Sequence, residues 1–137
     1  MVNQQTATMQ VPCSGWALED KSELLLKLYK KAMLCMDDAL ELIELGQMVE
    51  KGKCLIHAQD IVMQLADALD YQGEGYEVAD NLNRLYIYVY RLLTRGNTRL
   101  DCEAIREARE LMARLLTAWE QAASGLESAI PASRARF

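Results

Sequence analysis

Few side chains in this sequence combine the type and the spacing that catalysis or metal binding requires. The single histidine, His57, has no second histidine or cysteine at ligand spacing, so a structural role is expected for it. Asp37 and Asp38 are adjacent, and adjacent positions of a helix point in different directions rather than forming a carboxylate pair. Glu41 and Glu44 share a helical face, but no Glu-x-x-His pattern accompanies them, so a di-iron site is not indicated. The sequence predicts no catalytic residue, no metal site and no cofactor.

Two further patterns resemble ligand-binding motifs without meeting their requirements. Gly73 and Gly75 in the stretch QGEGYE are not a phosphate-binding loop, because no strand is expected before them and no Lys or Ser/Thr follows at the required spacing. Tyr86, Tyr88 and Tyr90 could stack on nucleic-acid bases, but a net charge of −5 argues against a surface that binds phosphates. We therefore expect neither an enzyme nor a nucleic-acid-binding protein.

Length and composition favour one folded domain. The chain has 137 residues, of which 51% are apolar and 26% charged, enough to build a single hydrophobic core. No apolar run approaches the roughly 20 residues that span a bilayer, and the first twenty residues show no secretory signal. These features predict a cytoplasmic protein without membrane insertion.

The four cysteines are widely separated and contain no CxxC pair, which argues against a disulfide framework and a zinc site. We expect reduced thiols, with three of the four at or near core faces; the cysteines are Cys13, Cys35, Cys54 and Cys102.

Apolar residues recur at helical spacing in four segments, separated mostly by glycine-containing breaks. The predicted helices run from about Asp20 to Gly46, Val49 to Tyr71, Glu77 to Arg95 and Leu100 to Ser124. Four helices of this length with short connections predict an all-α, antiparallel up-down four-helix bundle over residues 20–124. Residues 1–19 are expected to form a flexible N-terminal cap segment, and residues 125–137 a disordered tail.

Local signals place the ends of these helices. Asp20 and Glu23 have the spacing of a capping box, and Gly46 suits the position just after a helix end. Gly96 and Asn97 are expected to break the chain after the third helix, and Asp101 or a neighbour is expected to cap the fourth.

The second and third helices carry more apolar residues than one buried stripe needs. The expected core stripe of the second comprises Cys54, Ala58, Ile61, Val62, Leu65, Ala68 and Leu69, and that of the third Val78, Leu82, Leu85, Val89 and Leu92. Apolar residues also lie outside these stripes, and a surplus of this kind is typical of a surface kept for a partner. From helical phase we predict that the protein-binding surface comprises Ile56, Gln59, Met63, Ala66, Tyr86, Ile87 and Tyr90. The alternative is that the N-terminal segment or a homodimer contact buries Met63 or Ile87.

Several motifs occur in a characteristic order along the chain. The stretches are LLLKLYKKAM at 24–33, IELGQMVEKGKCLIHAQDIVMQL at 43–65, Leu69-Asp70, EVADNLNRLYIYVYRLL at 77–93, and Asn97 and Asp101 followed by LLTAWEQ at 115–121. Their order and spacing resemble the FliS family, the flagellin-specific export chaperones of the bacterial flagellum. The resemblance covers about residues 20–123.

The resemblance implies an antiparallel helical bundle without enzymatic activity, acting in the cytoplasm. The implied partners are the C-terminal segment of flagellin, which would otherwise polymerise prematurely, and the flagellar type III export machinery. Such recognition is helix-in-groove binding coupled to folding of the partner. An alternative from a different class is a non-enzymatic adaptor or regulatory bundle that self-associates or binds another protein through the same apolar surface. The oligomeric state stays open.

Overall fold

The computed structural model describes residues 18–127 as four long helices and one short 3-10 helix. They are α2 (Leu18–Glu44), α3 (Met48–Asp67), η1 (Gly73–Gly75), α4 (Tyr76–Arg99) and α5 (Cys102–Glu127). The described residues contain no strand, so the predicted all-α fold is confirmed. The predicted cap segment and tail lie outside the described residues, except that 18–19 and 125–127 belong to α2 and α5.

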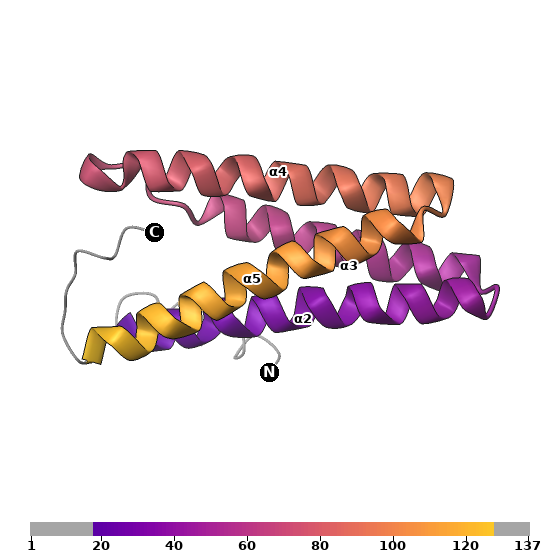
Figure 1. Ribbon diagram of the computed structural model, residues 1–137, viewed down its shortest axis with the longest axis horizontal. Coiled ribbons are helices and arrows are strands. Elements are labelled where there is room, and N and C mark those ends of the chain that lie inside the picture. The colour runs from indigo at the N-terminus through magenta and orange to yellow at the C-terminus, as the bar shows by residue number, and fades with distance from the viewer. Residues whose placement is uncertain (1–17, 128–137) are drawn as a thin grey trace, which may run out of the picture.

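Successive helices run in opposite directions, as an up-down bundle requires (Figure 1). α2 packs against α3 and α5, and α4 packs against the same two helices from the other side. α5 crosses obliquely, from α4 at its N-terminal end towards α2 at its C-terminal end (Figure 1). The last helix therefore closes the bundle onto the first. None of the helices in the described part of the chain is both long and apolar enough to cross a bilayer.

The turn between α2 and α3 is the glycine-terminated end that the sequence predicts. The N–H of Gly46 donates to the carbonyl of Ile43 at 3.1 Å, and the N–H of Gln47 donates to the carbonyl of Leu42 at 2.9 Å. This pair of bonds is a Schellman motif, which requires a left-handed residue, and Gly46 has φ +77°. At the connection between α4 and α5, Asp101 caps α5, because its Oδ1 accepts the N–H of Ala104 at 3.2 Å.

The predicted break at Gly96 and Asn97 is wrong, because α4 continues to Arg99. Gly96 lies where α4 meets α5, and a Cβ atom there would overlap Cγ1 of Ile105. The glycine is therefore explained by the close approach of two helices and not by a turn. α4 ends instead at Arg99, and the next residue, Leu100, takes the left-handed conformation with φ 53°.

α3 ends earlier than predicted, at Asp67 instead of Tyr71. The carboxylate of Asp70 accepts the N–H of Gln72 at 3.0 Å, so a side chain turns the backbone where helical bonds would otherwise form. The chain then enters η1 and the first turn of α4.

All four helices contribute to one core. On α4 the phase is different from the prediction. Its buried side follows Ala79, Tyr86, Val89, Leu93 and Gly96, together with Leu92, whereas Val78, Leu82 and Leu85 are only partly buried. Among the described residues, the largest fully buried side chains are those of Tyr29, Tyr86, Met36, Leu55, Leu92, Leu93, Ile105, Met112, Val62 and Val89.

Candidate functional site

The seven residues of the predicted protein-binding surface divide into two groups. Four are exposed apolar or aromatic side chains: Ile56 is 52% exposed, Met63 40%, Ile87 39% and Tyr90 38%. The other three, Gln59, Ala66 and Tyr86, are buried, so the expectation that helical phase places them at the surface is wrong. Each is buried for a local reason that hydrophobic periodicity does not encode.

Tyr86 is in the core because its hydroxyl finds a partner there. Its oxygen lies 2.6 Å from that of Tyr29, and the indole N–H of Trp119 donates to the Tyr29 hydroxyl at 3.0 Å. This chain of hydrogen bonds joins α4, α2 and α5. Burial raises the pKa of both tyrosines above the ordinary value of 10.0, so both remain neutral in the folded protein at physiological pH.

Gln59 is buried because α4 satisfies its amide. Its Nε2 donates to the carbonyl of Tyr90 at 3.0 Å and to Oγ1 of Thr94 at 2.8 Å. Ala66, on the same helix, is small enough to lie 9% exposed against the core. Gln59 therefore holds α3 against α4, and both residues are buried instead of forming the surface.

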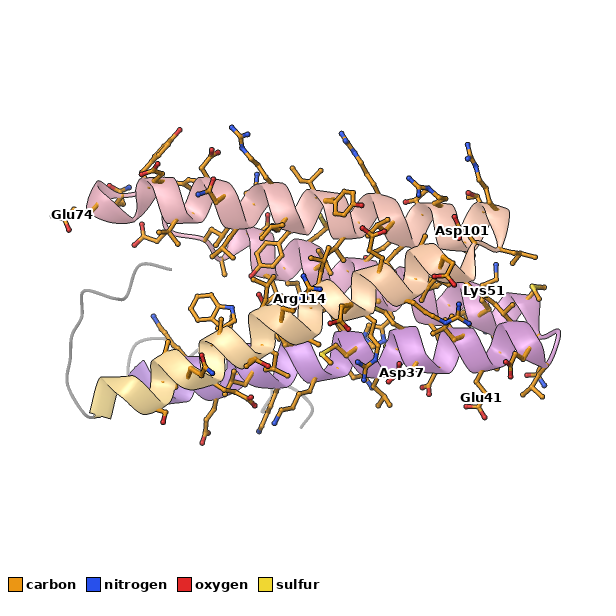
Figure 2. The ribbon with its side chains drawn as sticks, viewed as in Figure 1. Asp37, Glu41, Lys51, Glu74, Asp101 and Arg114 are labelled. Carbon is orange, nitrogen blue, oxygen red and sulfur yellow. The ribbon has the colours of Figure 1, made fainter. Side chains whose placement is uncertain are left out.

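A second polar contact holds the same two helices together further along. Lys51 is 6% exposed, and its ammonium donates to the carbonyl of Asn97 at 3.0 Å and to Oδ1 of Asn97 at 2.6 Å. Lys51 and Asp101 both lie towards the end of the bundle where α4 turns into α5 (Figure 2). The α3–α4 packing is therefore fixed at two levels, by Gln59 and by Lys51.

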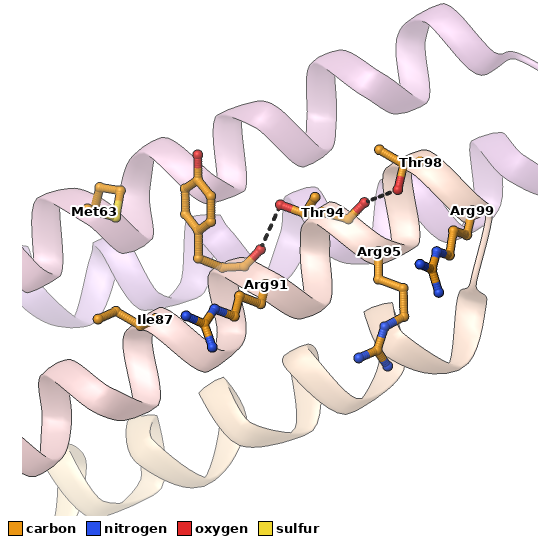
Figure 3. A pocket seen from close by; sticks show the side chains of 8 residues that line it. Met63, Ile87, Arg91, Thr94, Arg95, Thr98 and Arg99 are labelled. Carbon is orange, nitrogen blue, oxygen red and sulfur yellow. Dashed lines mark hydrogen bonds between the residues drawn. The ribbon is translucent and has the colours of Figure 1, made fainter.

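Above this polar support lies an open groove of about 630 Å³, which we call the α3–α4 groove. Figure 3 shows Met63 facing it from α3, with all other lining residues on α4; these are Ile87, Tyr90, Arg91, Thr94, Arg95, Thr98 and Arg99. Three of the four exposed residues of the predicted surface, all but Ile56, line this groove. This volume is within the range of about 300–1,000 Å³ that is typical of ligand-binding pockets.

The groove is apolar at one end and cationic at the other. Met63, Ile87 and Tyr90 form the apolar end. Thr94 and Thr98 donate their hydroxyls to carbonyls of their own helix, at 3.2 and 2.9 Å, and so present mainly methyl groups.

The cationic end was missed by reasoning from hydrophobic phase. Arg91, Arg95 and Arg99 recur at every fourth position and project from one side of α4 (Figure 3). The i, i+4, i+8 spacing of these arginines is visible in the sequence, but a net charge of −5 does not indicate a local positive strip.

The histidine and the three described cysteines do not line the α3–α4 groove. His57 lies with Nδ1 3.8 Å from the Cys35 sulfur. Cys35, Cys54 and Cys102 are free thiols, buried or partly buried as expected, and burial raises the pKa of Cys35 and Cys54. Between residues 18 and 127, no three His, Cys, Asp or Glu side chains gather in a way that would hold a metal ion.

Comparison with known proteins gives one consistent match. The family model described as "Flagellar protein FliS" matches residues 6–126. The "Flagellar secretion chaperone FliS" of Salmonella typhimurium is 36% identical over 100 residues, covering 72% of this chain and 73% of the relative. Its counterpart in Bacillus subtilis is 30% identical over 100 residues, or 73% of each chain. The "Flagellar secretion chaperone FliSB" of Pseudomonas aeruginosa is 35% identical over 78 residues, covering 57% of this chain and 61% of the relative.

Proposed function

Since this chain belongs to the FliS family of flagellar secretion chaperones, we propose that it binds the C-terminal segment of flagellin in the α3–α4 groove. Bound in this way, the segment cannot polymerise prematurely and is held for type III export by the flagellar machinery. The protein acts in the cytoplasm, where the cargo is made, and its role is binding, not catalysis.

The observation that carries this proposal is the set of exposed apolar side chains beside the groove. Met63 and Ile87 come from different helices and face one groove, with Tyr90 next to them. Ile56 lies seven residues before Met63 on α3 and is also exposed. Exposed apolar side chains that line one groove are the feature that an amphipathic segment recognises.

The energetics suit a cargo that is unfolded before it binds. Covering the exposed fractions of Met63, Ile87 and Tyr90 gains on the order of 1 kcal/mol each, before the cargo's own apolar residues are counted. Ordering the cargo segment costs about 2–5 kcal/mol of the gross contact energy. The two terms are of similar size, so the cargo's own apolar residues supply the net affinity.

The direct test is to mix the full chain with a flagellin C-terminal peptide and to measure stoichiometry and helicity. We expect a 1:1 complex in isothermal titration calorimetry, a negative heat-capacity change, and a gain of helical circular dichroism over the sum of the parts. No binding at about 50 μM, which corresponds to roughly −6 kcal/mol, would contradict the proposal.

Two variants locate the site. Met63→Glu with Ile87→Glu places carboxylates in the apolar end and is expected to weaken cargo binding roughly 100-fold, or about 2.7 kcal/mol. The matched control is Leu34→Glu with Val49→Glu, which changes two exposed apolar side chains outside the groove. Both variants are expected to unfold within about 1 kcal/mol of the wild type, since all four positions are exposed.

The alternative function, a regulatory bundle that self-associates through the same surface, is separated by the same measurements. Self-association would make the apparent mass of the chain depend on concentration in the absence of peptide. Met63→Glu with Ile87→Glu would then abolish the oligomer, and the flagellin peptide would have no effect on helicity.

A further inference from the structure

The arginines of the described residues fall into two classes. Four of them lie within 4 Å of a carboxylate: Arg84 pairs with Asp80, Arg106 with Glu103, Arg109 with Asp37 and Arg114 with Glu110. The remaining three have no carboxylate of residues 18–127 at that distance, and they are Arg91, Arg95 and Arg99, the cationic end of the α3–α4 groove.

Leaving these three charges together is unfavourable for the isolated protein. Like charges four residues apart on a helix repel one another, and three carboxylates of the adjacent helix α5, those of Glu103, Glu107 and Glu110, have other partners. Glu107, for example, accepts the hydroxyl of Tyr88 at 2.5 Å, and this bond raises the pKa of that tyrosine. In a chain of net charge −5, a strip of three unneutralised arginines beside an apolar groove calls for a compensating anion from outside.

We infer that the occupant of the α3–α4 groove is an acidic amphipathic segment, with carboxylates that pair with Arg91, Arg95 and Arg99. This inference rests on the proposed function, because it describes the partner of the same groove. The partner's apolar residues contact Met63, Ile87 and Tyr90, and its acidic residues recur about once per helical turn along one edge.

The polarity of the groove gives the segment a fixed register. Its apolar end lies towards Ile87 and its cationic end towards Arg99, twelve positions and about 18 Å further along α4. Arginine is suited to this task, because its planar guanidinium forms bidentate pairs with carboxylates. Apolar contact supplies affinity, and the three arginines select a partner of the right charge and fix how it lies.

A protein segment fits better than the other common anions. A phosphate backbone or an anionic bilayer would bring dense negative charge against a chain that is itself acidic, and neither uses an apolar end lined by methionine and isoleucine.

The test uses two synthetic helix-forming peptides of about 20 residues, long enough to form a stable helix once bound. They share a leucine stripe and differ only on one edge, where three glutamates at i, i+4 and i+8 in the first are glutamines in the second. At about 50 mM NaCl the full chain is expected to bind the glutamate peptide about tenfold more tightly, a difference of about 1.4 kcal/mol. At about 500 mM NaCl the preference is expected to disappear, because surface ion pairs are screened.

Two triple variants of equal charge assign the effect to the strip. Arg91→Gln, Arg95→Gln and Arg99→Gln together are expected to bind both peptides equally. The matched control changes three arginines that already have partners, Arg84→Gln, Arg106→Gln and Arg114→Gln, and is expected to keep the tenfold preference.

Several results would overturn the inference. They are equal binding of the two peptides by the wild type, binding of neither, and loss of the preference in the control variant, which would make net charge the cause. Strip-dependent binding to vesicles with about 30% phosphatidylserine, or to single-stranded DNA, without a preference for the glutamate peptide would assign the arginines to another class of partner. If binding of a flagellin peptide is lost in the Met63→Glu, Ile87→Glu variant but unaffected in the arginine variant, the proposed function stands and this inference alone is refuted.

Discussion

The sharpest prediction for the fold concerns two glycines that look alike in the sequence and differ in their surroundings. Gly52 is within α3 and Gly96 within α4. A Cβ atom at Gly52 would meet Asn97 Oδ1 at 3.7 Å, an ordinary contact. At Gly96 it would overlap the side chain of Ile105, with Cδ1 at 2.9 Å, and meet the carbonyl of Asp101 at 3.4 Å, so the Ile105 side chain or one of the two helices must shift.

The same substitution should therefore have opposite effects at the two sites. Glycine to alanine inside a helix gains up to about 1 kcal/mol of helix propensity at both positions. Only Gly96→Ala adds an overpacking cost, of about 1–3 kcal/mol. We expect Gly52→Ala to stabilise the protein by about 0.5–1 kcal/mol and Gly96→Ala to destabilise it by about 1 kcal/mol. The difference between the two variants isolates the packing cost, because the propensity gain is common to both.

Urea unfolding followed by far-ultraviolet circular dichroism measures both free energies, and thermal unfolding should separate the two midpoints by roughly 8 °C. A double-mutant cycle with Ile105→Ala supplies the mechanism, since Gly96→Ala should cost nothing once the side chain of Ile105 is shortened. If Gly96→Ala is as stable as the wild type, or if its cost persists beside Ile105→Ala, the close approach of α4 and α5 is not the reason for this glycine.

Two further predictions concern the buried polar contacts. Burial raises the pKa of Tyr29 and Tyr86, so above pH 10 the unfolded chain loses protons that the folded chain keeps, and stability should fall by up to about 1.4 kcal/mol per pH unit for each tyrosine. Urea midpoints between pH 8 and 11 measure this slope of unfolding free energy against pH. The slope should be shallower in Tyr86→Phe. An unchanged slope in that variant would show that other groups cause the pH dependence. Lys51→Met leaves the two oxygens of Asn97 without their donor and should cost about 1–2 kcal/mol in urea unfolding. A variant as stable as the wild type would show that the apolar replacement fully offsets the lost hydrogen bonds.

Periodicity predicted the architecture because each helix has one dominant apolar stripe. The four-helix bundle, the glycine end at Gly46 and the Asp101 cap all follow from signals that act within a few residues along the chain. The predicted resemblance to the FliS family is also confirmed, since it depends on the order of motifs over most of the domain.

The details of α4 could not be obtained in the same way, because they depend on partners distant in sequence. Tyr86 is buried through Tyr29, which is 57 positions away, and Gly96 is required by Ile105 on another helix. Reasoning from hydrophobicity favoured Leu82 and Leu85 for the core, but small residues let neighbouring helices approach the other side of α4. A polar group that finds a buried partner, or a glycine that permits contact, is indistinguishable from a surface residue or a break until the packing is known.

The candidate surface shows the same division. Ile56, Met63, Ile87 and Tyr90 are exposed where helical phase places them, while Gln59 is recruited into the α3–α4 contact by the carbonyl of Tyr90. The arginine strip follows from charge spacing and not from hydrophobic phase, and only the folded structure distinguishes its arginines from those that pair with carboxylates.

The most direct test of the central claim is a titration of the full chain with a flagellin C-terminal peptide, repeated with Met63→Glu and Ile87→Glu. We predict a 1:1 complex with gained helicity for the wild type and roughly 100-fold weaker binding for the variant, at unchanged stability. Tight binding that the variant retains would place the cargo elsewhere on the bundle, and no binding by the wild type at about 50 μM would contradict the claim altogether.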